Sequence, residues 1–519
     1  MRVTCVVLLG LSASSWAGIT VQKSGLTVPK EYAPRRDAAK LLFTTSYDAY
    51  KKYAFGHDDL SPVSESFNDQ RNGWGASIVD AMFVMGLEDD FLGAVNFSSQ
   101  INFNASKTTD TVSIFETTIR YLGGFLSSYE LSDYKHPILL EKAKEVADKM
   151  AYGWVGNNAI PYGFLQFSTN TPQIATSNIA EAGTLTLEWE TLSKYTKNAT
   201  YGKLATGAVK HIANLPAPLP GLAAQGIDPT TGAFVGGYVS WGGASDSYLE
   251  YLLKYARLTN TNDNIYLDTW KTAVDSSIHT LLKKSTVGNH TYLADYDDDG
   301  KIRHVGSHLA CFHAGNWLLG GKLLQNQTII NTALELNEAC WNTYASTVTG
   351  IGPEAFAFES SDGNFTAKFY NEHGFYITSS AYILRPEVLD VTGETKYLDR
   401  ASSAIDAFNK YLPTTVAFAA LNDVNSKNGG FIDDMQSFWF AEVLKYLYLT
   451  FDDPKHISLD DYVFNTECQP FKAPPALNSY KGSGGYLPHK PFTVQAGPAL
   501  PQISPNPFII SGVPQVDSE

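Results

Sequence analysis

Positive charge is scarce in this sequence. Its 519 residues include 38 Lys and Arg against 53 Asp and Glu, which gives a net charge of −15. Nucleic acids and anionic membranes attract basic surfaces, so neither is expected as the main partner. Long hydrophobic runs are missing as well, since no stretch beyond residue 17 is long and apolar enough to span a bilayer. We therefore expect a soluble protein.

The first 17 residues, MRVTCVVLLGLSASSWA, predict a secretory signal. Arg2 supplies the positive end, a short apolar run follows, and Ser15 and Ala17 are the small residues that precede a cut before Gly18. We expect the mature protein in the lumen of the secretory pathway or, because no KDEL-type ending is present, secreted. Six Asn-x-Ser/Thr sequons agree with export, and we expect most of them to carry glycans on surface loops: Asn96, Asn104, Asn198, Asn289, Asn326 and Asn364.

Cysteine is also rare. Removal of the signal takes Cys5 away and leaves Cys311, Cys340 and Cys468. In an oxidising compartment two of them can pair and one is left over. Cys311 and Cys340, 29 positions apart and within or beside helix-like segments, are the predicted disulfide. Three free buried thiols are the alternative.

Strong β alternation is scarce, whereas helical periodicity dominates from about residue 35 to 450. Apolar residues make up 44% of the chain and charged residues 18%, so a large core can form and wholesale disorder is excluded. We predict one all-α domain of catalytic size, built from helical hairpins and covering residues 18–472. Residues 473–519 are predicted to be an extended or disordered tail, because 10 of the 24 prolines lie between Pro470 and Pro514.

Eight acidic residues stand in mainly apolar surroundings: Asp80, Glu116, Glu188, Asp246, Glu250, Glu354, Glu387 and Glu442. The clearest case is SDSYLEYLLKY, in which Asp246 and Glu250 lie one helical turn apart among Tyr and Leu. Like charges at this spacing destabilise a helix by about 0.2–0.5 kcal/mol. Their presence needs an explanation.

Local explanations remain open for several of these acids. Two fit capping boxes, Ser113 with Glu116 and Ser247 with Glu250. Three fit helical ion pairs on a solvated face, namely Glu116 with Arg120, Glu250 with Lys254 and Glu442 with Lys445. The surroundings, however, are Phe, Tyr, Trp and Leu rather than the polar residues of an exposed face.

The alternative is an acidic cavity. Buried carboxylates are costly and are kept for active sites or metals. A ring of helices that each contribute an acid, with aromatic walls, suits a sugar, and glycoside hydrolysis needs one protonated acid and one carboxylate. Surplus acids could hold a hard cation. The run DYDDDG, residues 295–300, matches only half of an EF-hand loop, because Gly306 stands where a bidentate Glu is required, so we expect a polar turn there.

Together these segments resemble the class I α-1,2-mannosidases of glycoside hydrolase family 47, especially the exported fungal members. The likeness runs from about residue 35 to 470 and is carried by NGWGASIVDAM, SIFETTIRYLGG, SDSYLEYLLKY, the Cys311–Cys340 spacing, GIGPEAFAF, YILRPEVLD, QSFWFAEVLKYLYLTF and VFNTE. It implies an (α/α)7 barrel with a β-hairpin near the C-terminal end that plugs one mouth. It also implies Ca²⁺ at the barrel bottom, bound by the hydroxyl and carbonyl oxygens of Thr466 and by waters that carboxylates hold.

The reaction that the resemblance implies is inverting hydrolysis of terminal α-1,2-linked mannose from high-mannose N-glycans. Glu116 would be the proton donor, through a water, and Glu387 the base, with Asp246 close to the same chemistry and Glu354 the remaining catalytic acid. Asp80, Glu188, Glu250 and Glu442 would hold calcium-bound waters or sugar hydroxyls, with Arg385 and Phe438 near the sugar. Inversion predicts acid and base carboxyls about 6.5–9.5 Å apart. We expect a monomer.

The sequence also departs from the family pattern. Asp390 replaces the usual Glu after LRPE, Cys468 and Gln469 replace the common Ala-His, and His313 stands where an acid is common. We expect His313 to be a loop residue and not a ligand. The departures motivate an alternative, a weakly active or inactive lectin-like barrel that binds mannose glycans. A helical-toroid hydrolase of another linkage, such as a glucoamylase type, is a third possibility but leaves FNTE without a role.

Overall fold

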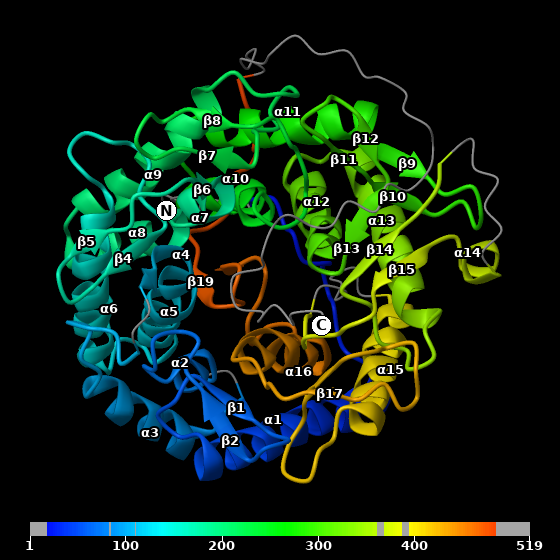
Figure 1. Ribbon diagram of the computed structural model, residues 1–519, viewed down its shortest axis with the longest axis horizontal. Coiled ribbons are helices and arrows are strands. Elements are labelled where there is room, and N and C mark those ends of the chain that lie inside the picture. The colour runs from blue at the N-terminus through cyan, green and yellow to red at the C-terminus, as the bar shows by residue number, and fades with distance from the viewer. Residues whose placement is uncertain (1–17, 83–84, 109–110, 361–367, 387–393, 484–519) are drawn as a thin grey trace, which may run out of the picture.

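The protein folds into a closed ring of helices, shown by a computed structural model that describes residues 18–82, 85–108, 111–360, 368–386 and 394–483 (Figure 1). The helices follow one another around the ring in chain order, and the ring confirms the predicted all-α class and (α/α)7 barrel. The α-helices are α1 (Ala33–Tyr53), α2 (Ala76–Asp80), α3 (Glu88–Ser99), α4 (Ile114–Thr117), α5 (Gly123–Leu131), α6 (Pro137–Met150), α7 (Ile179–Gly183), α8 (Thr186–Thr196), α9 (Thr200–Asn214), α10 (Asp246–Thr259), α11 (Ile265–Thr280), α12 (Phe312–Leu323), α13 (Gln327–Ala345), α14 (Lys368–His373), α15 (Thr395–Tyr411) and α16 (Lys445–Phe451).

Helices that are consecutive in the chain pack as antiparallel hairpins, as α5 does with α6, α8 with α9, α10 with α11 and α12 with α13. Helix α10 is buried on nearly all sides, so that even Ser247 and Glu250 are shielded from solvent. Local signals set some helix ends. The Asn326 side chain, for example, accepts hydrogen bonds from the N–H groups of Thr328 and Ile329 and thereby caps α13.

Large aromatic side chains fill the space between the helix layers. Trp74, Trp189, Trp241, Trp270, Trp317 and Trp439 are at most 1% exposed. Close approach of α12 to α11 requires Gly320, because a Cβ at that position would lie 2.0 Å from the Trp270 ring. The Trp270 indole nitrogen is satisfied there, since it donates to Asn316 Oδ1 at 2.8 Å.

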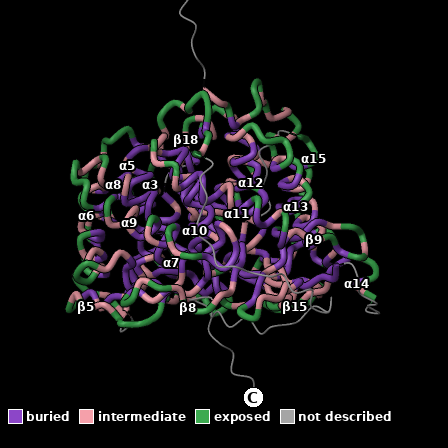
Figure 2. Tube along the Cα trace, turned by 90° about the horizontal axis from the view of Figure 1, so that it is seen from above, coloured by how far each residue is buried: buried purple, intermediate pink, exposed green. Residues whose placement is uncertain are grey.

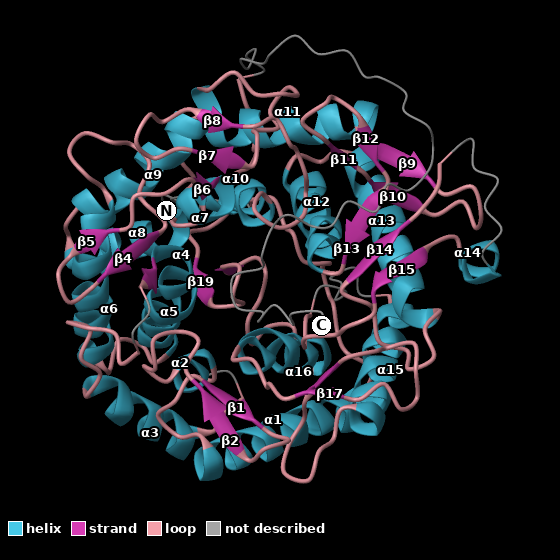
Figure 3. Cartoon of the chain, viewed as in Figure 1, coloured by secondary structure: helices cyan, strands magenta, loops and turns pink. Residues whose placement is uncertain are grey.

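The strands form only short antiparallel hairpins and three-stranded sheets. Figure 3 shows them as small inserts in the helical ring, and Figure 2 places β5, β8 and β15 at one end of the barrel and β18 at the other. The strands are β1 (Asp59–Ser61), β2 (Ser66–Asn68), β3 (Val112–Ser113), β4 (Phe164–Gln166), β5 (Thr171–Pro172), β6 (Ser177–Asn178), β7 (Gly226–Ile227), β8 (Phe234–Val235), β9 (Leu282–Lys284), β10 (Thr291–Leu293), β11 (Asp295–Tyr296), β12 (Ile302–Arg303), β13 (Val305–Ser307), β14 (Ala355–Ala357), β15 (Tyr376–Ser379), β16 (Ala420–Leu421), β17 (Phe431–Ile432), β18 (Tyr462–Phe464) and β19 (Pro470–Lys472).

Two predictions about hairpins are confirmed. The β18–β19 hairpin enters the ring, where β19 lies inside the helices in Figure 1, and it forms the predicted plug. The run DYDDDG forms the polar turn between β11 and β12, in which Asp297 Oδ1 accepts hydrogen bonds from the N–H groups of Asp299 and Lys301.

The first residues of the predicted tail, 473–483, pack on the barrel wall. Buried Arg257 donates to the carbonyls of Pro474 and Asp460, and the Tyr480 hydroxyl donates to Asn260. The N-terminal segment joins them through the Ile19 N–H and the Leu477 carbonyl. The signal at 1–17 and the tail from 484 onward lie outside the described residues. Across the described ranges no helix has the length and hydropathy that a membrane crossing requires.

Cys311 and Cys340 form the predicted disulfide, and Cys468 is buried and free. The bond ties the start of α12 to α13. We expect the double variant Cys311→Ser/Cys340→Ser to lose about 2–4 kcal/mol of unfolding free energy, because a closed loop restricts the unfolded chain. Urea titration measures this loss. Reduced wild-type protein should unfold at the variant's midpoint, and an unchanged midpoint for the variant would contradict the prediction.

The predicted glycan acceptors lie on the surface of the protein wherever the structure describes them. Asn96, Asn104, Asn198, Asn289 and Asn326 are all exposed. Asn364 lies outside the described residues.

Candidate active site

A cavity of about 840 Å³ lies in the centre of the barrel. Its wall brings together most of the predicted site residues from separate elements: Glu116, Asp246, Glu250, Glu354, Arg385, Phe438, Glu442 and Thr466. Asp80 and Glu188 lie behind this wall and are fully buried. Glu387 and Asp390 lie outside the described residues.

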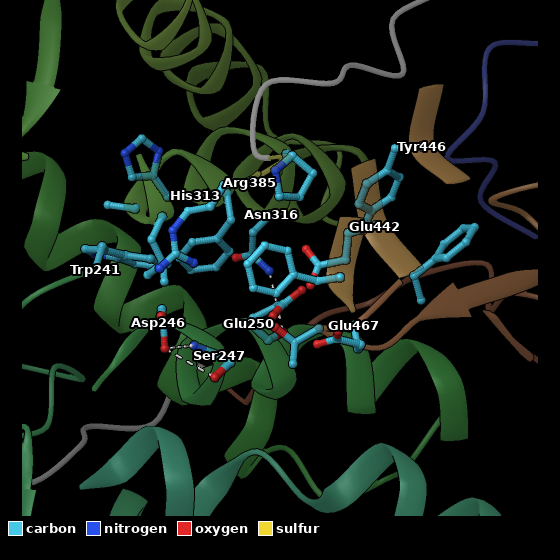
Figure 4. Close-up of a pocket in the computed structure, with 18 of the residues that line it drawn as sticks. Trp241, Asp246, Ser247, Glu250, His313, Asn316, Arg385, Glu442, Tyr446 and Glu467 are labelled. Carbon is cyan, nitrogen blue, oxygen red and sulfur yellow. Dashed lines mark hydrogen bonds between the residues drawn. The ribbon is translucent and has the colours of Figure 1, made fainter. Parts of the chain in front are cut away.

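Figure 4 shows how the labelled side chains are distributed. Trp241 and Asp246 lie at one end, and Glu442, Tyr446 and Glu467 lie at the other, next to the strands of the plug. Glu250 and Arg385 lie between them. Carboxylates therefore occur along the whole length of the cavity.

Glu116 is fixed by a buried arginine. The Ser113 hydroxyl accepts a hydrogen bond from the Glu116 N–H at 3.2 Å, so one half of the first predicted capping box forms, while the Glu116 carboxylate turns to Arg120 instead of the Ser113 N–H. Arg120 Nε donates to Glu116 Oε2 at 2.8 Å, so this predicted ion pair also forms, although Arg120 is only 4% exposed and not on a solvated face. Burial raises the pKa of Glu116, but the guanidiniums of Arg120 and Arg71 outweigh it and hold this pKa below its ordinary value. Glu116 is thus an ionised carboxylate.

Arg120 also joins Glu116 to the floor of the cavity. Its NH1 group lies 3.3 Å from Asp80 Oδ2 and contacts Glu467 and the Ser437 hydroxyl. Arg120 belongs to a π-helix, η2 (Thr118–Leu122), and Glu442 belongs to a second one, η5 (Trp439–Leu444). Such π segments inside helices occur frequently at functional sites, because they shift side chains out of the regular helical register.

Asp246 begins α10 and faces a different environment. Its Oδ1 accepts hydrogen bonds from the N–H and hydroxyl of Ser247 at 2.7 and 3.2 Å. Burial raises the pKa of Asp246 to about 6, with a smaller contribution from Glu250, against these hydrogen bonds. The predicted capping box of Ser247 with Glu250 is wrong, because the helix starts two residues earlier than that box requires, with Ser245 at the N-cap, and the Ser247 hydroxyl also accepts a hydrogen bond from Thr184.

Glu250 keeps its predicted partner. It forms an ion pair with Lys254, and both side chains are nearly buried, unlike those of a solvated face. This pair and the cavity environment explain how α10 tolerates two acids one turn apart.

Glu354 and Arg385 form the opposite wall. Arg385 Nε lies 3.0 and 3.1 Å from the two Glu354 oxygens. Burial raises the pKa of Glu354 although Arg385 opposes the shift. The Phe438 ring lies about 6 Å from the guanidinium carbons of both Arg385 and Arg120, within range of a cation–π contact. An aromatic face beside two arginines and a carboxylate suits a sugar ring and its hydroxyls.

The turn of the plug, residues 465–469, presents Thr466 to the cavity. No hydrogen bond from a described residue reaches its hydroxyl or carbonyl oxygen. Behind it, Glu188 Oε1 accepts from the Tyr251 hydroxyl at 2.6 Å, while Glu188 Oε2 is buried without a partner among the described residues. Burial raises the pKa of Glu188 and of Glu442 to about 8 each. Among the described residues, no group of three or more His, Cys, Asp or Glu side chains is placed to hold a metal ion. Direct coordination of a metal ion would therefore depend on the oxygens of Thr466.

These observations fit a hard cation at the floor. Free threonine oxygens and uncompensated carboxylates are the donors that Ca²⁺ prefers, with waters completing its shell. A cation there would also lower the raised pKa values of the surrounding carboxyls.

Two sequence predictions near the floor need correction. The ion pair of Glu442 with Lys445 does not form, because Lys445 is buried and donates to the Cys468 carbonyl and to Gln469 Oε1 at 3.0 and 3.2 Å. His313 is not a loop residue. It lies in the first turn of α12, is 5% exposed and lines the cavity, because packing of α12 in the barrel overrides the weak local signals of CFHAGN. Burial lowers the pKa of His313 to about 3, so it is neutral.

Sequence reasoning missed several residues of the cavity. Arg71, Arg120, Glu181, Asp295 and Glu467 all line it. Glu181, in NIAEAG, and Glu467, in VFNTE, carried the same signal of an acid among apolar or small residues. Arg71 carried no such signal. The spacing of Arg120 from Glu116 predicted their ion pair but assigned it to a solvated face and not to the cavity.

One protein family and several known proteins are similar to this chain. The family model of glycosyl hydrolase family 47 matches residues 42–473. The chain is 39% identical over 477 residues to mannosyl-oligosaccharide alpha-1,2-mannosidase 1B of Aspergillus phoenicis, which covers 84% of this chain and 91% of that protein. It is 37% identical to the enzyme of the same name from Emericella nidulans, over 90% of this chain and 98% of that one. The structure of an alpha-1,2-mannosidase from Trichoderma reesei superposes with a TM-score of 0.82 at 35% identity, covering 85% of this chain and 99% of that chain.

Proposed function

Because this chain belongs to glycosyl hydrolase family 47, we propose that it releases terminal α-1,2-linked mannose from high-mannose N-glycans by calcium-dependent hydrolysis with inversion. The observation that carries the proposal is the convergence of Glu116, Asp246 and Glu354 on one central cavity of a chain so similar to named α-1,2-mannosidases. Secretory location and N-glycan substrates agree with the predicted signal and sequons.

Asp246 and Glu116 have different roles in the protonation of the leaving oxygen. Asp246, with a pKa of about 6, holds a proton in mildly acidic solution. Glu116 is kept ionised by Arg120 and Arg71, so it would act by orienting a water that relays the proton of Asp246 to the leaving oxygen, while the base takes the proton of the attacking water. Glu387, which lies outside the described residues, is the proposed base, and inversion requires space for the attacking water between base and substrate.

The remaining residues bind the sugar. Glu354 with Arg385 supplies fixed acceptors and donors for hydroxyls, and Phe438 supplies an apolar surface beneath the ring. Thr466 would hold Ca²⁺ through its hydroxyl and carbonyl oxygens, with waters held by Glu188, Glu442, Glu250 and Asp80. When bound, the ion supplies a hard positive centre that orients water and sugar hydroxyls at the cavity floor.

Purified protein incubated with Man-α1,2-Man tests the proposal. We expect mannose release from this disaccharide and little from the α1,3- and α1,6-linked disaccharides, and ¹H NMR of the first turnovers should show β-mannose. Retained α-mannose would contradict inversion. Tight glycan binding without mannose release would favour the lectin-like alternative.

Calcium removal gives a separate prediction. Raising free Ca²⁺ to about 100 times its Kd should stabilise chelator-treated protein by about 2.7 kcal/mol. Thr466→Val should lose this stabilisation, because it removes one of the two proposed threonine ligands. Thermal unfolding with and without Ca²⁺ measures it. Thr332→Val, the same change on α13, should keep the full response. A calcium response that survives in Thr466→Val would remove Thr466 from the site.

A further inference from the structure

Asn465 uses its whole side-chain amide to shape the turn of the plug. Its Oδ1 accepts hydrogen bonds from the N–H groups of Glu467 and Gln469 at 2.9 and 2.7 Å. Its Nδ2 donates to the Ile119 carbonyl at 2.9 Å and to Glu188 Oε1 at 2.8 Å. Two donors face the oxygen and two acceptors face the nitrogen, so this orientation of the amide is the one that satisfies all four groups. Asn465 is fully buried.

The backbone of the turn closes on the same residue. The Asn465 N–H donates to the Gln469 carbonyl at 2.9 Å, and the Cys468 N–H donates to the Asn465 carbonyl at 3.2 Å. Cys468 adopts a left-handed conformation, with φ at 55°. The Asn465 side chain therefore holds a tightly folded segment and does not merely fill space beneath it.

Thr466 is placed by the same network. Its N–H donates to the Tyr251 hydroxyl at 3.2 Å, and that hydroxyl donates to Glu188 Oε1, which also accepts from Asn465. The ring of contacts from Asn465 through Glu188 and Tyr251 to Thr466 thus links the turn to α8 and α10. Because the Thr466 N–H is bound to Tyr251, the turn is held with Thr466 at the cavity wall, where its hydroxyl and carbonyl oxygens can accept a ligand.

Gly123 leaves the room that Asn465 needs. A Cβ at Gly123, the first residue of α5, would lie 2.6 Å from Asn465 Nδ2, so one of the two would have to shift. The backbone of Gly123 is helical, and Ala is otherwise favoured over Gly in a helix. The absence of a side chain here is explained by its contact with Asn465.

We propose that Asn465 is a positioning residue for the metal-binding turn. It fixes residues 465–469 against α8 and the π-helix η2 so that the oxygens of Thr466 face the cavity. The inference rests on the calcium role of Thr466 proposed above. Residues that orient metal ligands typically change metal affinity by about 10–100-fold when mutated.

Gly123→Ala is the sharper of two variants, because it leaves every hydrogen-bonding group in place and only displaces the amide. We expect its Kd for Ca²⁺, measured from calcium-dependent thermal shifts of chelator-treated protein, to rise about 10–100-fold. At saturating Ca²⁺ its kcat should return to that of the wild type. Gly93→Ala is the matched control, since Gly93 lies in α3 and a Cβ added there would have nothing within 4 Å, and its Kd should not change.

Asn465→Asp is the second variant. It keeps the acceptor for the two N–H groups but replaces the two donated hydrogen bonds with a negative charge next to Glu188. We again expect weaker Ca²⁺ binding. Asn337→Asp puts the same charge into α13, a helix that contributes no residue to the cavity wall, and should lower global stability without changing the Kd.

Cys468 gives a readout that needs neither calcium nor substrate. It is buried in the turn and is the free thiol of the described chain, so its alkylation rate, followed by mass spectrometry of its peptide, reports opening of the turn. We expect labelling at least about 10-fold faster in Gly123→Ala and Asn465→Asp than in their controls. If wild-type protein shows no response to Ca²⁺, the calcium proposal fails, and faster labelling still supports a turn held by Asn465. Unchanged labelling and unchanged Kd in both variants would overturn the inference.

Discussion

Asp246→Asn should lower kcat by about 10²–10⁴-fold, the range typical of a lost general acid. Asn has nearly the shape of Asp and can still accept the hydrogen bonds of Ser247, so α10 should keep its start. What the variant loses is a proton that can be transferred. Steady-state kinetics on Man-α1,2-Man measure the change, and circular dichroism should confirm that the fold is intact. Activity within about threefold of wild type would exclude Asp246 from the acid chemistry.

The pH profile sharpens this prediction. The folded-state pKa of Asp246 is raised, to about 6, so its proton is present below that pH and lost above it. Wild-type kcat should therefore fall as pH rises through about 6. This falling limb of the plot of kcat against pH should be absent in Asp246→Asn. Asp295→Asn is the matched control. Asp295 also lines the cavity with a pKa raised to about 6 by burial, so its removal should leave the limb in place.

Glu116→Gln completes the comparison. Because Arg120 and Arg71 keep Glu116 ionised, its removal should lower kcat without moving the limb near pH 6. A limb that disappears in Glu116→Gln and persists in Asp246→Asn would reverse the two roles.

Arg120→Met should destabilise the protein by about 3–5 kcal/mol and abolish activity. Arg120 is the shared cation of Glu116, Asp80 and Glu467, and its removal leaves buried carboxylates without compensation. Urea titration at pH 7.5 measures the loss. Arg35→Met removes an exposed arginine paired with Asp406 and should cost less than about 1 kcal/mol.

The loss of unfolding free energy in Arg120→Met should depend on pH, and the direction of this dependence can be predicted. Arg120 makes the largest contribution that lowers the pKa of Glu116, so without Arg120 this pKa rises in the folded state, and the pKa of Glu467, which burial already raises, rises further. A group with a raised folded pKa contributes stability at low pH that is lost as pH rises. The deficit of Arg120→Met should therefore shrink between pH 7.5 and pH 4.5. A deficit that stays constant over this range would show that packing, and not charge, is what Arg120 contributes.

Predictions that depended on neighbours in the chain were confirmed in part. The ion pairs of Glu116 with Arg120 and of Glu250 with Lys254 formed as their spacing predicts. Of the capping box of Ser113 with Glu116, only the hydrogen bond to the Ser113 hydroxyl formed. Where the local pattern failed, a distant segment had intervened. Lys445 turned away from Glu442 because the plug offers it two carbonyl-type acceptors, at Cys468 and Gln469.

The sequence by itself determined the helical class, the disulfide and which acids are unusual, because periodicity, cysteine number and the cost of charge in apolar segments are properties of composition and spacing. It could not determine what each acid does. Glu116 and Asp246 look alike in the sequence, yet one lies beside two guanidiniums and the other in a site where burial outweighs the hydrogen bonds from Ser247 and raises the pKa. Those surroundings come from residues far apart in the chain, and electrostatic energy depends on distance in space. Only the tertiary structure therefore decided which carboxyl can hold a proton.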